Sequence, residues 1–169
     1  MSDANRAADQ PRDPATSDEV TGLLNRAGFE PLAEHRFRLS DRTRVPVILV
    51  FLRMTPPPEA TDEARTELLV EVAGVIRAAT READLSARLG DDGFCVLLAG
   101  NASGAEAAVL SRIVEGLADR NARNDRPAPL SMAIGTASYE PGTRRSLDDV
   151  VHEAAARMQE PDRGTDPTG

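Results

Sequence analysis

The hydrophobic and polar positions along this chain predict alternating helices and strands within one folded unit. Two stretches, residues 61–80 and 105–122, carry apolar residues at the spacing of an amphipathic helix. Their predicted inward positions are Leu68, Leu69, Val72, Val75 and Ile76 in the first stretch, and Val109, Leu110, Ile113, Val114 and Leu117 in the second. Further helices are predicted at residues 17–24, where Ser17 and Asp18 can cap the N-terminus, at 28–39 and at 147–158.

Four other apolar stretches have the length of strands. Residues 45–53 are rich in β-branched side chains, and the prolines that begin at Pro56 end this stretch. Residues 84–89 and 94–99 are joined by Gly90-Asp91-Asp92-Gly93, a short connection typical of a hairpin, and residues 130–139 form the last strand. This order of elements predicts an α+β fold, with helices over a mainly antiparallel sheet.

The two ends of the chain lack this periodicity. Residues 1–16 and 161–169 are polar and rich in Pro or Asp, so we expect two disordered tails around a single domain at residues 17–160. No apolar run approaches the roughly 20 residues that a membrane helix needs, which predicts no membrane contact. The single cysteine, Cys95, has no partner for an internal disulfide, and a cytoplasmic location is expected.

Composition narrows the classes of function. The net charge is −8 and aromatic residues make up 3% of the chain, so neither general nucleic-acid binding nor a stacking platform for single strands is expected. All twenty basic residues are arginine. Any mechanism that requires a lysine is therefore excluded.

Four segments, in order, resemble the motifs of GGDEF domains, the family of bacterial diguanylate cyclases. Residues 18–29 resemble the opening motif Asp-x-Leu-Thr-Gly-Leu-x-Asn-Arg-Arg-x-Phe, and residues 81–94 resemble the segment with the signature hairpin. Residues 131–136 are similar to the Ser-Ile-Gly strand, and residues 147–158 stand in place of the closing helix. The resemblance implies a nucleotidyl-cyclase-like fold with a ferredoxin-like core. The opening motif is interpreted as scaffold.

The resemblance also implies that the catalytic site is degenerate. The family places one metal-binding aspartate on its first core strand, within an Asp-x-Asp motif, and this chain has Phe51 at the first aspartate and Arg53 at the second. The signature Gly-Gly-Asp/Glu-Glu-Phe becomes Gly90-Asp91-Asp92-Gly93-Phe94, so only Asp92 keeps an acidic family position. Mg²⁺ prefers oxygen ligands, which neither phenylalanine nor arginine supplies. We therefore predict no catalytic residues, no cofactor and no metal. A weak metal site at Asp91 and Asp92 is the alternative to a simple acidic turn.

One ligand site is implied in addition. Arg81 and Asp84 match the Arg-x-x-Asp motif that lies five residues before the signature and binds cyclic di-GMP in many GGDEF domains. An arginine can form paired hydrogen bonds to guanine or phosphate oxygens, and an aspartate can accept from guanine. The alternative is that both residues are merely solvated at a helix–strand junction.

Three functions follow from these features. The first is a catalytically inactive signalling module that acts through protein contacts, as a homodimer or with another signalling protein. The second is a dedicated receptor for cyclic di-GMP. The third is residual GTP binding or cyclase activity.

Overall fold

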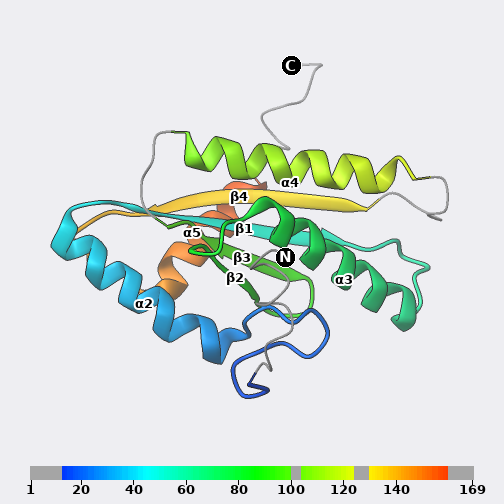
Figure 1. Cartoon of the computed structure of the whole chain (residues 1–169), viewed down its shortest axis with the longest axis horizontal. Helices are drawn as coiled ribbons and strands as arrows, with labels where there is room; N and C mark the ends of the chain where they lie inside the picture. Colours follow the sequence, from blue (N-terminus) through cyan, green and yellow to red (C-terminus); the bar gives the residue numbers. More distant parts are fainter. Residues whose placement is uncertain (1–12, 100–103, 124–129, 160–169) are drawn as a thin grey trace, which may run out of the picture.

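The computed structural model describes residues 13–99, 104–123 and 130–159. Along the chain, the elements are α2 (Arg26–Thr43), β1 (Val47–Thr55), α3 (Asp62–Ala79), β2 (Leu85–Arg88), β3 (Gly93–Leu97), α4 (Ala105–Asn121), β4 (Ser131–Tyr139) and α5 (Leu147–Gln159). The strands form one antiparallel sheet in the order β2-β3-β1-β4 (Figure 1). The predicted α+β class is confirmed.

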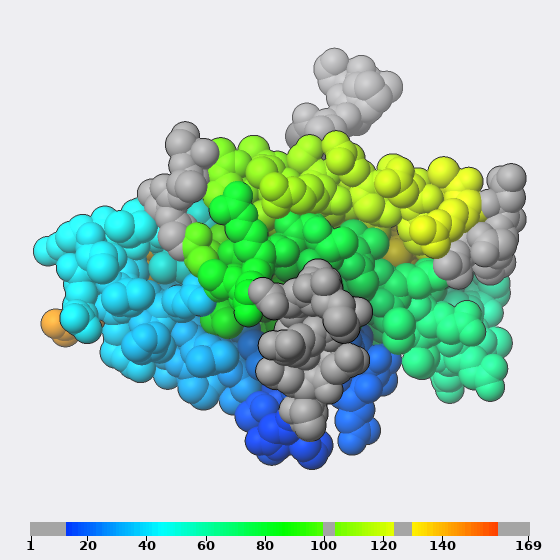
Figure 2. Space-filling view, viewed as in Figure 1, coloured from blue at the N-terminus to red at the C-terminus, as the bar shows by residue number. Residues whose placement is uncertain are grey.

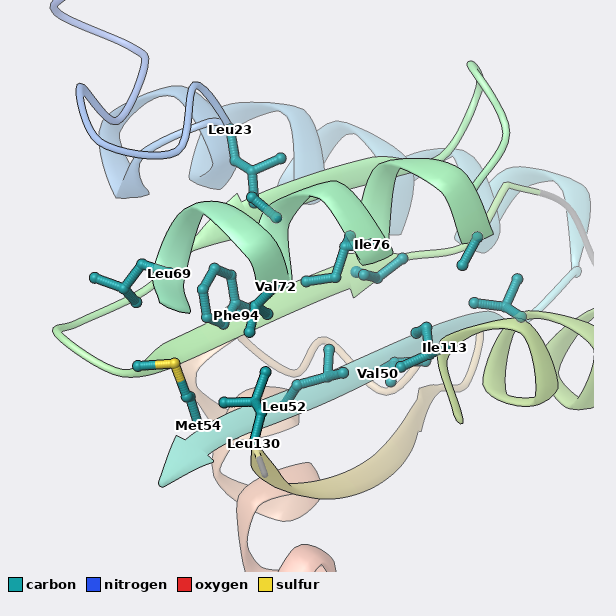
Figure 3. Close-up of a cluster of buried hydrophobic side chains, with 14 of the residues drawn as sticks. Leu23, Val50, Leu52, Met54, Leu69, Val72, Ile76, Phe94, Ile113 and Leu130 are labelled. Atoms are coloured by element: carbon teal, nitrogen blue, oxygen red, sulfur yellow. The ribbon is translucent and has the colours of Figure 1, made fainter. Parts of the chain in front are cut away.

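The sheet is covered by helices on both faces because alternate strand residues point to opposite sides. On one face, Val50, Leu52 and Met54 of β1 pack with α3 and α4, as Figure 3 shows for α3. On the other face, Leu49 and Phe51 pack with α2 and α5. β1 is therefore buried on both sides and carries the continuous apolar run that made it recognisable in the sequence.

The helices begin and end near the predicted residues. The Thr61 side chain caps α3 by accepting from the Ala64 backbone N–H at 3.1 Å, and Asn25 caps α2 by accepting from Gly28 at 2.9 Å. α2 is longer than predicted at both ends. It finishes at Arg44, whose φ of 63° is the left-handed conformation of a helix C-cap.

The predicted helix at residues 17–24 is wrong, because this segment is a turn held against the edge of the sheet. The Asp18 carboxylate accepts from the Thr21 backbone N–H at 2.9 Å and from its hydroxyl at 2.7 Å. Gly22 then takes a φ of 73°. Leu24 bonds to β2 through its own N–H and carbonyl, so tertiary pairing replaces the helix.

One predicted inward residue, Val114, is 55% exposed. A Cβ on Gly116 would stand 2.9 Å from Val75, so α4 approaches α3 closely at this glycine. That contact turns Val109 and Ile113 into the core and leaves Val114 outside. The other predicted inward positions of both helices are buried or packed against the core.

Most of the predicted tails, residues 1–12 and 160–169, lie outside the described residues. Residues 13–16 form a turn, and the Thr16 carbonyl accepts from the Asn25 N–H at 3.0 Å. A Cβ on Gly28 would stand 2.3 Å from that carbonyl oxygen, so a glycine is required at this position in α2. Within the described residues, no helix is long and apolar enough to cross a membrane.

Candidate functional site

The predicted hairpin lies beside the central strand. β2 and β3 pair with each other, and β3 pairs with β1 so that Phe51 faces Cys95 and Arg53 faces Gly93. The turn is closed by a 2.9 Å hydrogen bond from the Leu89 N–H to the Gly93 carbonyl. The structure therefore brings together the strand positions and the turn that the resemblance placed in one site.

Phe51 fills the strand position where the resemblance implies a carboxylate. Its side chain is 5% exposed and belongs to the core between the sheet and α2 and α5. The Arg53 guanidinium lies over the Phe51 ring, 5.5 Å from its centroid, which is a cation–π distance. This part of the strand is apolar and positively charged, the reverse of a metal-binding edge.

The turn itself carries an ion pair. Arg65 of α3 donates to the Asp92 carboxylate at 2.9 Å, with both side chains partly exposed. Asp91 is exposed, and its backbone carbonyl accepts from Arg88 at 2.9 Å. Within the described residues, no cluster of three or more His, Cys, Asp or Glu side chains could hold a metal ion. The residues present do not fit Mg²⁺, which requires several oxygen ligands.

Packing explains the glycine at position 93, where the family has glutamate. A Cβ there would stand 2.4 Å from the Leu89 carbonyl oxygen and 3.1 Å from the Phe51 ring. Gly90 has a φ of 78°, a conformation that favours glycine. The large ring at position 51 and the missing side chain at position 93 thus fit each other.

The opening motif holds this hairpin in place. Arg88 donates to the Asp18 carboxylate at 3.2 and 3.3 Å and reaches the Asp91 carbonyl with its other nitrogen. Burial alone would raise the pKa of Asp18, but the hydrogen bonds from Thr21 and the charge of Arg88 outweigh burial and lower it. Asp18 is therefore a structural anion that ties the N-terminal turn to the end of β2.

The Arg-x-x-Asp motif forms a tight turn between α3 and β2. The Asp84 carboxylate accepts from the Arg81 N–H and from the Ala99 N–H, each at 2.8 Å. The Arg81 side chain is exposed and makes no hydrogen bond with any residue that the structure describes. Asp84 thus has a structural role at the end of β3, while the Arg81 guanidinium remains available to a ligand.

Two further arginines border this turn, and the sequence did not indicate them. Arg36 of α2 donates to the Ala83 carbonyl at 2.6 Å, and Arg112 of α4 donates to the Ala79 carbonyl at 3.2 Å. They come from helices far apart in the chain and carry no local motif. In a sequence with twenty basic residues, only the fold singles them out.

Cys95 lies on β3 and is fully buried, so burial raises the pKa of its thiol. This agrees with the interpretation of an inert core residue. It also shows that β3 presents no nucleophile to the surface at this position.

An antiparallel sheet of this order, with a Gly-Asp-Asp-Gly turn beside its central strand, defines a GGDEF-type α+β module. A family model described as Diguanylate cyclase, GGDEF domain, matches residues 15–165. The chain belongs to the GGDEF family. This confirms the resemblance on which the site assignments depend.

Individual relatives agree with this family. Diguanylate cyclase TpbB of Pseudomonas aeruginosa is 35% identical over 150 residues, which cover 85% of this chain and 34% of that protein. The chain thus spans about a third of the length of this relative.

Two solved structures share the fold. The GGDEF domain of DgcB from Caulobacter crescentus, solved in complex with c-di-GMP, is 21% identical with a TM-score of 0.78, covering 92% of this chain and 95% of that one. SiaD from Pseudomonas aeruginosa, solved in complex with its activator SiaC, is 21% identical with a TM-score of 0.79, covering 96% of this chain and 63% of that one. At this identity they establish the fold alone.

Proposed function

We propose that this chain is a catalytically inactive GGDEF module that acts through protein contacts. Two observations carry the proposal together: the Arg65–Asp92 ion pair at the turn, and the buried Phe51 ring at the strand position where the resemblance implies a metal ligand. Joining two GTP molecules requires charge neutralisation of their phosphates by metal ions held on carboxylates. Here the Asp92 carboxylate is neutralised by an arginine of the same chain, and the Phe51 side chain has no atom that can bind a metal.

The test is a turnover assay with purified protein, GTP and Mg²⁺, beside an active GGDEF domain as positive control. We expect no cyclic di-GMP above background. Turnover that disappears in Asp92→Ala but survives in Asp91→Ala would contradict the proposal and support residual cyclase activity. Binding of GTP without turnover would instead support a nucleotide-binding module.

We further propose that cyclic di-GMP binds at Arg81, which would make the module responsive to this nucleotide or a dedicated receptor for it. The supporting observation is the arrangement of Arg36 and Arg112 on either side of the Arg81–Asp84 turn. Three guanidinium groups near one turn suit a ligand with two phosphates and two guanines. The co-crystallised DgcB domain shows that this fold can carry cyclic di-GMP.

Calorimetry separates binding from folding at this site. Arg81→Ala removes an exposed guanidinium, so affinity should fall about tenfold to hundredfold with an unchanged melting temperature. Asp84→Ala removes the acceptor of two backbone N–H groups and should cost about 1–3 kcal/mol of unfolding free energy. Arg123→Ala, at the far end of α4, is the matched control. Absence of heat from the wild type at high micromolar ligand would refute the receptor and leave the first proposal standing.

A further inference from the structure

A surface pocket lined by acidic and basic side chains lies at the end of the molecule where α2 finishes and the loop from β4 to α5 begins. Its volume is about 250 Å³, and its charged lining residues are Glu34, Arg38, Asp41, Arg144 and Arg145. Figures 1 and 2 show the orange loop beside the cyan end of α2 at the left edge of the molecule. The pocket belongs to neither the hairpin nor the Arg81 turn.

Asp41 fixes the geometry of this pocket. One carboxylate oxygen accepts from the Tyr139 hydroxyl at 2.9 Å and from the Gly142 N–H at 2.8 Å. The hydrogen bond from Gly142 is the main reason that the pKa of Asp41 lies below its usual value, and Arg44 and Arg144 lower it further. The loop after β4 is thereby tied to the last turn of α2.

Two strained residues meet at this point. Arg44, with a φ of 63°, and Arg144, with a φ of 54°, are the non-glycine residues with positive φ in the part of the chain that the structure describes. The Arg44 guanidinium lies 3.6 Å from where a Cβ on Gly142 would stand. Glycine adopts this conformation without a steric penalty, whereas arginine does not. At Arg44 this conformation ends α2 as a C-cap, and at Arg144 it lies in the loop after β4, so a glycine would suit both positions.

Three of the four guanidinium groups around the pocket have no hydrogen-bond or ion-pair partner among the described residues. Arg145 is bound to Glu153 at 2.6 Å. By contrast, Arg38, Arg44 and Arg144 make no guanidinium hydrogen bond or ion pair with any described residue, although Asp41 attracts the last two at longer range. The chain has a net charge of −8, so it has more carboxylates than arginines. Three neighbouring arginines without a carboxylate partner are therefore unexpected. A guanidinium fork matches carboxylate and phosphate oxygens.

We propose that this pocket binds a compact oxyanion, a carboxylate or phosphoryl group on an acidic segment of a partner protein. The donors are Arg38 and Arg144, which line the pocket, and Arg44, whose guanidinium lies beside the pocket at Gly142. The Asp41 contacts hold the loop that presents Arg144. The inference rests on the proposed function only in assuming a protein partner. It adds the face of the module that is contacted and the chemistry of the contacting segment.

The test uses fluorescence anisotropy with three labelled peptides: alternating Glu and Ser, alternating phosphoserine and Gly, and alternating Gln and Ser. Saturable binding of either acidic peptide, but not of the neutral one, supports the proposal, and the stronger of the two identifies the oxyanion. Inorganic phosphate should compete if the phosphoryl group is preferred. No saturable binding below about 1 mM of either acidic peptide would overturn the proposal.

Two variants replace the arginines that have positive φ by glycine, so that loss of the side chain can be separated from loss of stability. Arg44→Gly and Arg144→Gly suit a positive φ, so their melting temperatures should stay level or rise while affinity falls about tenfold each. Arg38→Ala should weaken binding without the gain in stability. Arg123→Ala removes the same charge at the far end of α4 and should leave affinity unchanged. An equal loss of affinity in Arg123→Ala would show that binding depends only on the overall charge, and would overturn the proposed site. That result would leave the outcome of the cyclase and cyclic di-GMP assays unaffected.

Discussion

At the scale of single residues, the unusual side chains of the hairpin and of β1 fit their surroundings. The ring of Phe51 occupies space that a side chain at position 93 would also need. Arg65 supplies the positive charge that Asp92 requires. The sequence identified the altered positions, because they stand at fixed distances within a motif. It could not identify Arg65, since a partner 27 residues away on a helix is set by the fold.

Restoring one carboxylate should therefore damage the protein without restoring chemistry. Phe51→Asp removes a buried ring and buries a charge, which should cost about 3–5 kcal/mol of unfolding free energy. Urea denaturation measures the loss, and the GTP turnover assay should remain at background. Phe51→Leu, which keeps an apolar side chain, is the control for packing. Clear cyclase activity in Phe51→Asp would show that the other altered positions do not prevent catalysis, and would contradict this prediction.

At the scale of elements, the sequence predicted the helices and strands that have their own hydrophobic periodicity. The prediction was wrong for residues 17–24, whose structure depends on a neighbouring strand. α3 and α4 have apolar stripes, and both were located to within two residues. Residues 17–24 begin like a capped helix, but Asp18 is used by Arg88 as well as by Thr21. A contact across 70 residues thus decides the local structure of the opening motif.

The Asp18–Arg88 contact predicts a stability difference that is present at neutral pH and is lost in acidic solution. The pKa of Asp18 is lower in the folded than in the unfolded protein, so its contribution is complete above the unfolded pKa of about 4 and is lost as pH falls through the folded value. Asp18→Asn should be less stable than the wild type at pH 7, and the two unfolding free energies should converge toward pH 2. Denaturant midpoints across this range provide the measurement. A constant difference at all pH values would contradict an ionic role for Asp18.

At the scale of the whole molecule, the two hydrophobic cores share one sheet. Alternate residues of β1 and β3 point to opposite cores, so exposing the interior of β3 requires that the packed unit opens as a whole. The resemblance predicted this architecture well, because the order of motifs follows the order of elements. It did not predict which arginines lie around the Arg81 turn or around the pocket at the end of α2, since these arginines do not follow a regular spacing in the sequence.

Cys95 offers a direct probe of such opening. Its thiol is buried and its pKa is raised, so a thiol reagent should react in native conditions only through unfolded molecules. The labelling rate should rise with urea in parallel with the unfolding equilibrium. Phe51→Leu should accelerate it in proportion to lost stability. Rapid labelling of the folded protein without denaturant would reveal a local opening of β3.

The Arg65–Asp92 pair has a consequence for how this hairpin behaves in a changing cell. A metal-bound carboxylate needs a cation from solution, and its surroundings respond to the supply of that cation and of the nucleotide it carries. Arg65 belongs to the same chain, so its charge is always available to Asp92. The hairpin should keep the same shape through magnesium starvation, chelation or a collapse of the GTP pool. The shape of the hairpin surface should therefore not depend on the concentration of Mg²⁺ or GTP. A signal that changes the module would have to act on another part of the molecule.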